Sequence, residues 1–177
     1  MEHFHVQAPF GPLTVVCAAD AVHAIHFLPA VTAAAPESRF AKQVAEELAQ
    51  YFADPKFVFT VPVQLTGTAF QCRLWQALRA IPAGEVRCYG ELSAQLASSA
   101  RAVGGACRRN PVPIIVPCHR VVAATGVGGF AGAVSGPLLS IKHWLLRHEG
   151  ICDQTTDSVD TPYGRTGDLF AIAGVMP

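Results

Sequence analysis

Apolar residues in the first part of the chain follow the spacing of strands and then of a helix. Residues 3–27 form short β-prone runs interrupted by turn residues, and residues 37–52 place apolar side chains four apart on one helical face. Residues 57–61 form another short β-prone run. Strands with a covering helix predict a small α+β unit with an antiparallel sheet, ending near residue 64.

Helical spacing dominates the rest of the chain. Thr68 and Gln71 have the spacing of a capping box, and the helix that they begin stops before Pro82. Pro137 is suited to the first position of a last helix, which continues to Gly150. These signals predict a second, mostly helical unit over residues 65–152.

Two short helices are predicted within this second unit. Residues 89–96 and 100–109 have helical spacing, and Ser98 or Ser99 can cap the second helix. Two short helices joined by a tight turn are typical of a helix-turn-helix. Residues 153–177 form a tail to which the sequence assigns no role.

Charge is distributed unevenly along a chain whose formal net charge is zero. Residues 1–64 hold three Lys and Arg against six acids, whereas residues 65–150 hold nine against three. The tail from residue 151 holds one Arg against four Asp. A basic middle between acidic ends indicates that the middle of the chain faces a polyanion.

Composition favours a compact globular protein of the cytoplasm. Of the 177 residues, 51% are apolar and 15% charged, which is too apolar for a disordered chain. No apolar run approaches the roughly 18 residues of a membrane span, and the N-terminus lacks the layout of a signal peptide. The six cysteines include no CxxC pair, so most are expected to be small buried thiols.

One cysteine has neighbours that suggest chemistry. Cys118 precedes His119 and Arg120, between two apolar β-branched runs that predict an extended segment. Cysteine attacks as the thiolate, and a nearby base or cation raises the thiolate fraction. Adjacent side chains of an extended segment point to opposite faces, so a water is expected to bridge His119 to Cys118. A Cys-His pair alone is a weak signal.

The surrounding motifs are more specific. They are Gly84-Glu85-Val86, Tyr89-Gly90-Glu91-Leu92, Arg101-Ala102-Val103-Gly104-Gly105-Ala106, Asn110-Pro111-Val112-Pro113, Pro117-Cys118-His119-Arg120-Val121 and Trp144-Leu145-Leu146-Arg147-His148-Glu149-Gly150. In this order they resemble the O6-alkylguanine-DNA alkyltransferases, strongly over residues 67–150 and loosely before them.

The resemblance implies a self-inactivating DNA repair reaction. Cys118 would accept the alkyl group, and His119, oriented by Glu149, would draw its proton through a water. Tyr89 would donate to the departing guanine, and Asn110 would hold the turn that leads into the cysteine segment. Because a thioether is not hydrolysed, each molecule would act once.

The resemblance also implies contacts to double-stranded DNA that contains O6-alkylguanine, and possibly O4-alkylthymine. Arg101 on the second helix would fill the space of the flipped nucleotide, with that helix in the minor groove. Small residues would allow close approach, and further arginines complete the predicted DNA-binding set: Ala102, Gly104, Gly105, Ala106, Arg108 and Arg120.

The flipped base would be read by main-chain groups of Cys118, Val121 and Ala131, beside Tyr89 and Phe130. The family often has tyrosine where Phe130 stands and serine where Ala131 stands. Cys107 occupies a pocket-wall position where bulkier residues are usual. The stretch from 130 to 142 is about five residues longer than the commonest family spacing, which predicts a larger loop beside the pocket.

For the whole chain, the resemblance implies a ribonuclease H-like N-terminal domain over 1–64 and a winged-helix-like catalytic domain over 65–152. It implies no cofactor and a monomer. Some relatives hold zinc in the first domain, and the candidate ligands His3, His5, Cys17, His23 and His26 match that pattern poorly. We therefore predict no metal.

Two other functions remain open at this stage. A damage sensor with the same fold would bind alkylated DNA without transfer, but such proteins replace the acceptor, and Cys118 is present. A cysteine hydrolase could use Cys118 and His119, but it would need an oxyanion hole and leaves the basic helix-turn-helix unexplained.

Overall fold

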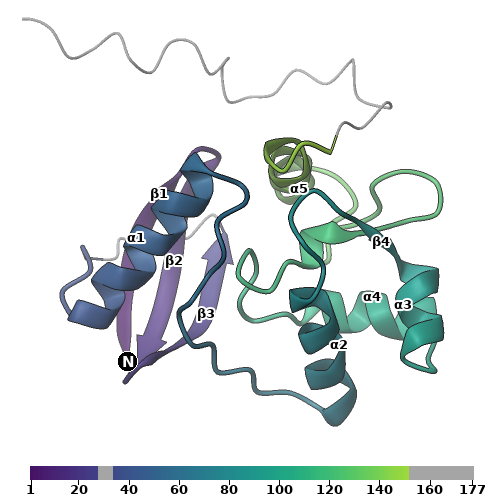
Figure 1. Ribbon diagram of the computed structural model, residues 1–177, viewed down its shortest axis with the longest axis horizontal. Coiled ribbons are helices and arrows are strands. Elements are labelled where there is room, and N and C mark those ends of the chain that lie inside the picture. The colour runs from purple at the N-terminus through teal and green to yellow at the C-terminus, as the bar shows by residue number, and fades with distance from the viewer. Residues whose placement is uncertain (28–33, 152–177) are drawn as a thin grey trace, which may run out of the picture.

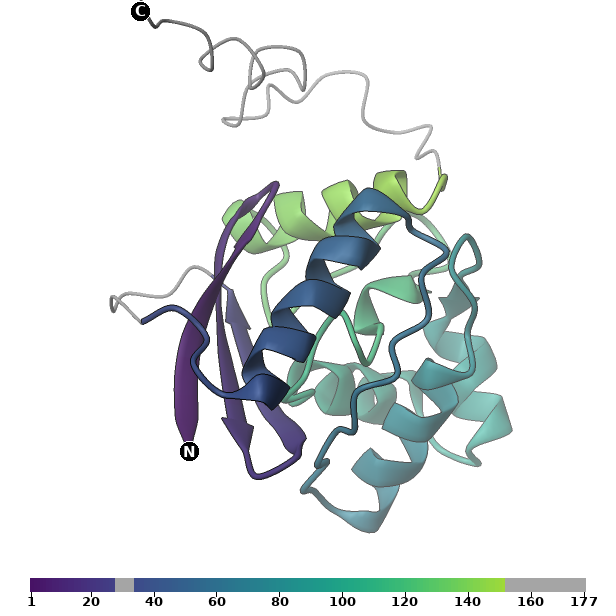
Figure 2. The same cartoon turned by 60° about the vertical axis from the view of Figure 1, so that its left-hand side comes forward.

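The computed structural model describes residues 1–27 and 34–151. The predicted tail at 153–177 lies outside the described residues. The architecture is α+β, as predicted: a three-stranded sheet with one helix, followed by a mostly helical part (Figures 1 and 2). None of the helices in the described part of the chain is both long and apolar enough to span a bilayer.

The N-terminal sheet is antiparallel in the order β1 (Glu2–Ala8), β2 (Gly11–Ala18) and β3 (Ala21–Phe27). Helix α1 (Arg39–Ala53) covers one face, and Ser38 caps its first turn by accepting from the Ala41 amide. Apolar side chains from the strands and the helix, among them Phe4, Leu13 and Leu48, are fully buried between them. The strands predicted within residues 3–27 and the helix predicted over 37–52 are confirmed.

The predicted strand at 57–61 is wrong. This stretch has no regular structure, and two of its amides donate to a side chain and not to a neighbouring strand. The buried carboxylate of Glu47 on α1 accepts from the amides of Thr60, at 2.8 Å, and Val61, at 3.2 Å. The local β-prone pattern does not show that the carboxylate of Glu47, more than ten residues away in the sequence, accepts hydrogen bonds from these backbone amides.

The second part begins with α2 (Ala69–Arg79), followed by α3 (Tyr89–Gln95) and α4 (Ala100–Arg108). The last helix is α5 (Pro137–His148). The capping box of α2 at Thr68, the Ser99 cap of α4 and the proline at the start of α5 are confirmed. Helices α3 and α4 pack together as the predicted helix pair.

The two parts share one continuous cluster of buried apolar side chains. The Ile25 amide on β3 donates to the Pro111 carbonyl at 2.9 Å, and the Trp75 indole on α2 donates to the Ala106 carbonyl on α4 at 3.1 Å. The sheet is thereby fixed to the segment that leads into the cysteine motif. The division into domains at 64/65 stays a prediction.

The capping box of α2 generates a stability prediction. Thr68→Ala removes the side-chain acceptor of the Gln71 amide, so the free energy of unfolding should fall by about 1 kcal/mol. Urea unfolding followed by circular dichroism measures it. Thr66→Ala, at an exposed threonine just before the helix, is the control and should stay near wild type. Equal losses in both variants would contradict the capping role.

Candidate active site

The segment that leads to Cys118 is a strained turn and not the extended run predicted from its sequence. Ile114 has a φ of +75°, which is costly for a β-branched residue. Asn110 holds this turn: its side-chain amide donates to the Val116 carbonyl at 2.7 Å, and its Oδ1 accepts from the Val112 amide at 3.1 Å. Cys118 then begins a short 3₁₀ helix, η1 (Cys118–Arg120).

Parallel pairing of two short strands brings the helix-turn-helix to this segment. Strand β4 (Arg87–Cys88) pairs with β5 (Val121–Val122), so Tyr89 at the start of α3 lies beside the cysteine segment. The Tyr89 hydroxyl donates to the Gly129 carbonyl at 3.4 Å. Gly128 has a φ of +72°, and a Cβ there would meet the Tyr89 ring at 3.2 Å, so only glycine suits this position.

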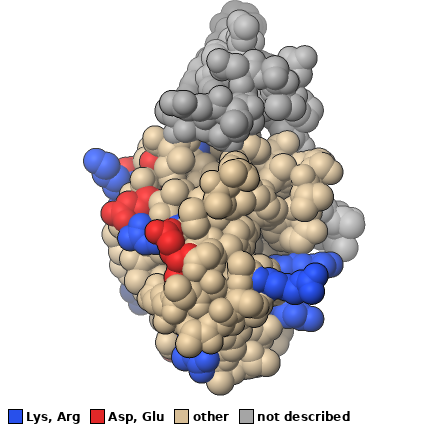
Figure 3. Space-filling view, turned by 90° about the vertical axis from the view of Figure 1, so that its right-hand side faces the viewer, with Lys and Arg blue, Asp and Glu red and all other residues tan. Residues whose placement is uncertain are grey.

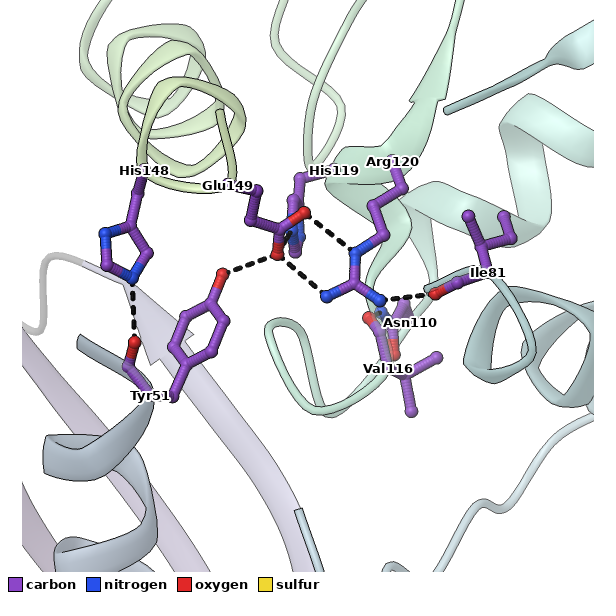
Figure 4. A network of polar contacts seen from close by, with 8 residues as sticks. All are labelled: Tyr51, Ile81, Asn110, Val116, His119, Arg120, His148 and Glu149. Carbon is purple, nitrogen blue, oxygen red and sulfur yellow. Dashed lines mark hydrogen bonds and ion pairs between the residues drawn. The ribbon is translucent and has the colours of Figure 1, made fainter. Parts of the chain in front are cut away.

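A buried carboxylate lies at the centre of the site (Figure 4). Glu149 Oε1 is 2.9 Å from Nε2 of His119, and neither side chain is exposed. Arg120 donates to both carboxylate oxygens, from Nε at 2.9 Å and from Nη2 at 2.8 Å, and its Nη1 donates to the Ile81 carbonyl. A two-point arginine contact of this kind fixes the plane of the carboxylate.

The end of α5 sets the position of Glu149. Glu149 is the C-cap residue, and Gly150 follows with a φ of +82°. The Gly150 amide donates to the Arg147 carbonyl at 3.0 Å, and the Ile151 amide donates to the Leu146 carbonyl at 2.9 Å. This is the Schellman motif, and it fixes the backbone from which the carboxylate projects.

The protonation of the pair follows from its surroundings. Burial by itself would raise the pKa of Glu149, but hydrogen bonds from His119 and Arg120 outweigh it and lower the pKa to about 2. Burial lowers the pKa of His119, and Glu149 opposes this effect only in part. At neutral pH the carboxylate is therefore ionised and the imidazole neutral, so Nε2 carries the proton that Glu149 accepts.

This tautomer leaves Nδ1 of His119 as a proton acceptor. Nδ1 is buried and has no hydrogen-bond partner among the described protein groups. Burial raises the pKa of the neighbouring Cys118 thiol, although the Asn110 side chain and the Lys142 charge lower it. A thiol that stays protonated needs a base, and the free Nδ1 can supply one.

Cys118 lines a cavity of about 230 Å³. The cavity is lined by residues from β3, from α4 and the turn after it, and from the loop before α5: Ile25, His26, Phe27, Cys107, Arg108, Asn110, Pro113, Cys118, Ala131 and Leu138.

The predicted pocket residues divide into two groups. Ala131 and Cys107 line the cavity, and Tyr89 lies close enough to both Cys107 and Cys118 for their charges to act on it. Burial and these two thiols raise the pKa of Tyr89 to about 12, so its phenol keeps its proton. Phe130, in contrast, is buried in the core, with its ring 5.4 Å from that of Phe27.

The main-chain role predicted for Val121 stays a prediction. Its side chain is fully buried, and its carbonyl already accepts from Lys142 Nζ at 2.6 Å. The segments that carry the pocket residues were predicted from the sequence, but the orientations of Phe130 and Ala131 depend on the turn from 130 to 133. In that turn Ala131 and Gly132 both have positive φ.

Most of the predicted DNA-contacting residues lie on the exposed side of α4. Arg101 and Arg108 are exposed, and Ala102, Gly104 and Gly105 are half-buried. The prediction for Arg120 is corrected: its side chain is 11% exposed and its donors are directed to Glu149 and Ile81. A guanidinium held in this way is not available to a phosphate.

Two site residues were missed in the sequence. Lys142 on α5 is fully buried, and its Nζ donates to the carbonyls of Val121, Val127 and Gly129 at 2.6, 2.7 and 3.0 Å. Its position on the apolar face of the last helix was the available signal. Tyr51 on α1 donates to Glu149 at 2.8 Å, and nothing in the local sequence marks it.

Burial of Lys142 has an electrostatic effect on the site. Burial lowers its pKa to about 8, while the Cys118 and Cys107 thiols act in the opposite direction. Its three carbonyl acceptors lie on the strand after Cys118 and on the loop beside the cavity. The ammonium group thus ties that loop to α5 and places positive charge near the Cys118 sulfur.

The candidate zinc ligands do not converge. In residues 1–27 and 34–151 no three of the His, Cys, Asp and Glu side chains are placed to hold a metal ion. The cysteines described there, which include Cys17, Cys107 and Cys118, are free thiols.

The low pKa of Glu149 predicts an acid-sensitive stability. A carboxyl that titrates near 2 in the folded chain and near 4.5 ordinarily contributes about 3 kcal/mol above pH 4.5. Because the unfolded chain binds the proton first, this contribution is lost as the pH falls from 4.5 to 2. Glu149→Gln removes this contribution. The difference in the free energy of unfolding between wild type and Glu149→Gln should therefore disappear as the pH falls from 4.5 to 2.

Urea unfolding at a series of pH values measures this gap. Glu46→Gln, at an exposed glutamate of α1, is the control and should keep the wild-type slope. A constant gap between wild type and Glu149→Gln from pH 7 to pH 2 would show that the carboxylate is not held ionised in the folded chain.

Comparison with known proteins identifies the family. The family model for the 6-O-methylguanine DNA methyltransferase DNA-binding domain matches residues 69–151. The methylated-DNA–protein-cysteine methyltransferase of Methanosarcina acetivorans is 37% identical over 154 residues, which are 82% of this chain and 96% of that protein. The enzyme of the same name from Salmonella typhimurium is 50% identical over 111 residues, which are 60% of this chain.

The match spans 62% of the length of the Salmonella relative. Among solved structures, the crystal structure of Mycobacterium tuberculosis OGT in complex with DNA superposes with a TM-score of 0.73 at 35% identity. It covers 85% of this chain and 93% of that one. The chain belongs to the family of methylated-DNA–protein-cysteine methyltransferases.

Proposed function

We propose that this protein transfers the alkyl group of O6-alkylguanine in DNA irreversibly to the sulfur of its own Cys118. The observation that carries the proposal is a cavity-lining thiol whose neighbour in the chain is a neutral imidazole that Glu149 holds by Nε2. His119 keeps Nδ1 as an acceptor, and a bridging water carries the thiol proton to it. The relatives' names describe the same reaction class.

The reaction is a displacement at the alkyl carbon. The Cys118 sulfur forms a bond to that carbon, the bond from carbon to O6 breaks, and its electron pair goes to the guanine. Protonation lets guanine leave as a neutral base, and we assign this donation to Tyr89, whose phenol keeps its proton and lies near the Cys107 and Cys118 thiols. The product is a thioether, which water does not cleave, so each molecule acts once.

The target carbon lies inside a duplex, so the base must be flipped out of the stack. We propose that α4 enters the minor groove and that Arg101, which is exposed near the start of α4, occupies the space of the flipped nucleotide. Gly105 supports this assignment. A Cβ at Gly105 would meet nothing within 4 Å, so packing within the protein does not require glycine there. Helix-interior glycine costs about 1 kcal/mol relative to alanine, and close approach of DNA accounts for it.

Charge on this side of the molecule suits a DNA backbone. Figure 3 shows the side of α3 and α4, where basic side chains project at one edge and at the lower end, whereas at the other edge acidic side chains lie among further basic ones. Of the nine Lys and Arg in residues 65–150, Arg120 and Lys142 serve the interior and the remaining seven are exposed. The related M. tuberculosis protein has been crystallised with DNA.

We further propose that the N-terminal part up to residue 64 and the catalytic part up to residue 152 act as one body, because they share a core. A monomer that acts in the cytoplasm, with double-stranded DNA as its partner, fits these features. The catalytic set is Cys118, His119, Glu149, Tyr89 and Asn110.

The first prediction of this proposal concerns the site of the label. With duplex DNA that carries methyl-labelled O6-methylguanine, we expect one equivalent of label on the peptide that contains Cys118. Cys118→Ala should bind the same duplex and accept no label; Cys72→Ala is the matched control and should behave as wild type. Binding without label in the wild type would indicate a damage sensor, and repeated release of label into solution would indicate a hydrolase.

The second prediction separates base flipping from chemistry. Arg101→Ala should slow transfer from duplex DNA by at least about tenfold, yet leave the rate with free O6-benzylguanine within about twofold, because a free base needs no extrusion. Single-turnover rates on both substrates measure the effect. Arg39→Ala, at an exposed arginine of α1, should alter neither rate. Equal losses of Arg101→Ala on both substrates would refute the role in flipping.

A further inference from the structure

Tyr51 reaches the catalytic carboxylate from the other part of the molecule. It lies on α1, 98 residues before Glu149, and its hydroxyl donates to Glu149 Oε1 at 2.8 Å. Its side chain is fully buried. In Figure 4, Tyr51 approaches Glu149 from the side opposite to Arg120.

We propose that Tyr51 is a positioning residue of the alkyl transfer, acting on His119 through Glu149. This inference rests on the proposed function. Three donors converge on Glu149 Oε1, from His119, Arg120 and Tyr51, and Oε2 accepts from Arg120 alone among the contacts described. Tyr51 is thus the third of the donors that hold Glu149 Oε1, the oxygen that accepts from His119.

The phenol is itself held in place. The Tyr51 carbonyl lies 2.7 Å from Nε2 of His148, and the two rings meet edge to face at 5.3 Å. The ring of Phe59 also packs against Tyr51, with the ring centroids 5.4 Å apart. Burial and the negative charge of Glu149 raise the pKa of Tyr51, so the group acts as a donor throughout the working range. A buried, protonated and anchored hydroxyl has the properties of a fixed hydrogen-bond donor.

Removal of this donor has two consequences for His119. The carboxylate is less firmly oriented, so fewer molecules aim Nδ1 at the cysteine proton and the maximal rate falls. The carboxylate also retains more of its charge, so the imidazole becomes more basic. The charged groups that face His119 are Glu149, Arg120 and Lys142, and Tyr51→Phe leaves all three in place.

The test is the pH dependence of single-turnover transfer from O6-methylguanine duplex to Cys118 in Tyr51→Phe. The rate depends on neutral His119 and so rises with pH along an acidic limb. We expect this limb to move to higher pH in the variant and the plateau to fall about tenfold, which corresponds to about 1.4 kcal/mol in the activation free energy. Phenylalanine keeps the ring, so packing is preserved.

Phe59→Leu is the matched control. It disturbs the packing around Tyr51 but keeps the hydroxyl, so it should lower stability and leave the acidic limb where it is in wild type. A limb that stays in place in Tyr51→Phe, with or without a lower plateau, overturns the inference, as does a shift to lower pH. Absence of labelling in the wild type would instead refute the proposed function itself.

A second measurement covers the case in which Tyr51→Phe does not fold. Fluorotyrosine placed at position 51 alone is a stronger hydrogen-bond donor of nearly the same shape. It should move the acidic limb to lower pH, opposite to the effect of phenylalanine, and an unmoved limb would overturn the inference.

Discussion

The buried carboxylate of Glu149 is the interaction on which the rest of the site depends. It joins α5 through its own backbone, η1 through His119 and Arg120, and α1 through Tyr51. A buried ion pair contributes little net stability, but removal of one partner leaves an uncompensated charge that costs about 3–5 kcal/mol. The network therefore acts mainly by permitting a single arrangement, in which the imidazole has one tautomer and one orientation.

A second constraint operates at the turn before Cys118. The positive φ of Ile114 stores strain of about 1–3 kcal/mol, and the Asn110 side chain and the buried contacts of the segment hold it. After this turn the backbone does not continue as an extended segment, and η1 begins at Cys118. Because of this bend, the sulfur lines the cavity while the adjacent imidazole turns inward to Glu149. The strained turn thus allows the side chains of Cys118 and His119 to point in different directions.

Local signals were sufficient to predict most of the fold. The cap at Thr68, the cap at Ser99 and the proline at the start of α5 depend on interactions within one turn of helix, and all three are present. The sequence motifs were sufficient to identify Cys118 and His119 as candidate catalytic residues. The failures depend on distant partners: Glu47 removes the predicted strand at 57–61, and Glu149 withdraws Arg120 from the surface. The contact of Tyr51 with Glu149 could not be predicted, because no local pattern shows what a buried hydroxyl will meet.

Under the proposed function, burial also explains how an acceptor that is used once is kept from reacting too early. A low-dielectric environment raises the pKa of Cys118, so the resting sulfur is a weak nucleophile toward small electrophiles in solution. Under the proposed function, the proton leaves only along the path to His119, when a base-sized substrate fills the cavity and excludes bulk water. The positive charge of Lys142 then favours the thiolate as it forms. The same burial that suppresses wasteful reactions strengthens each of these contacts when the substrate is in place.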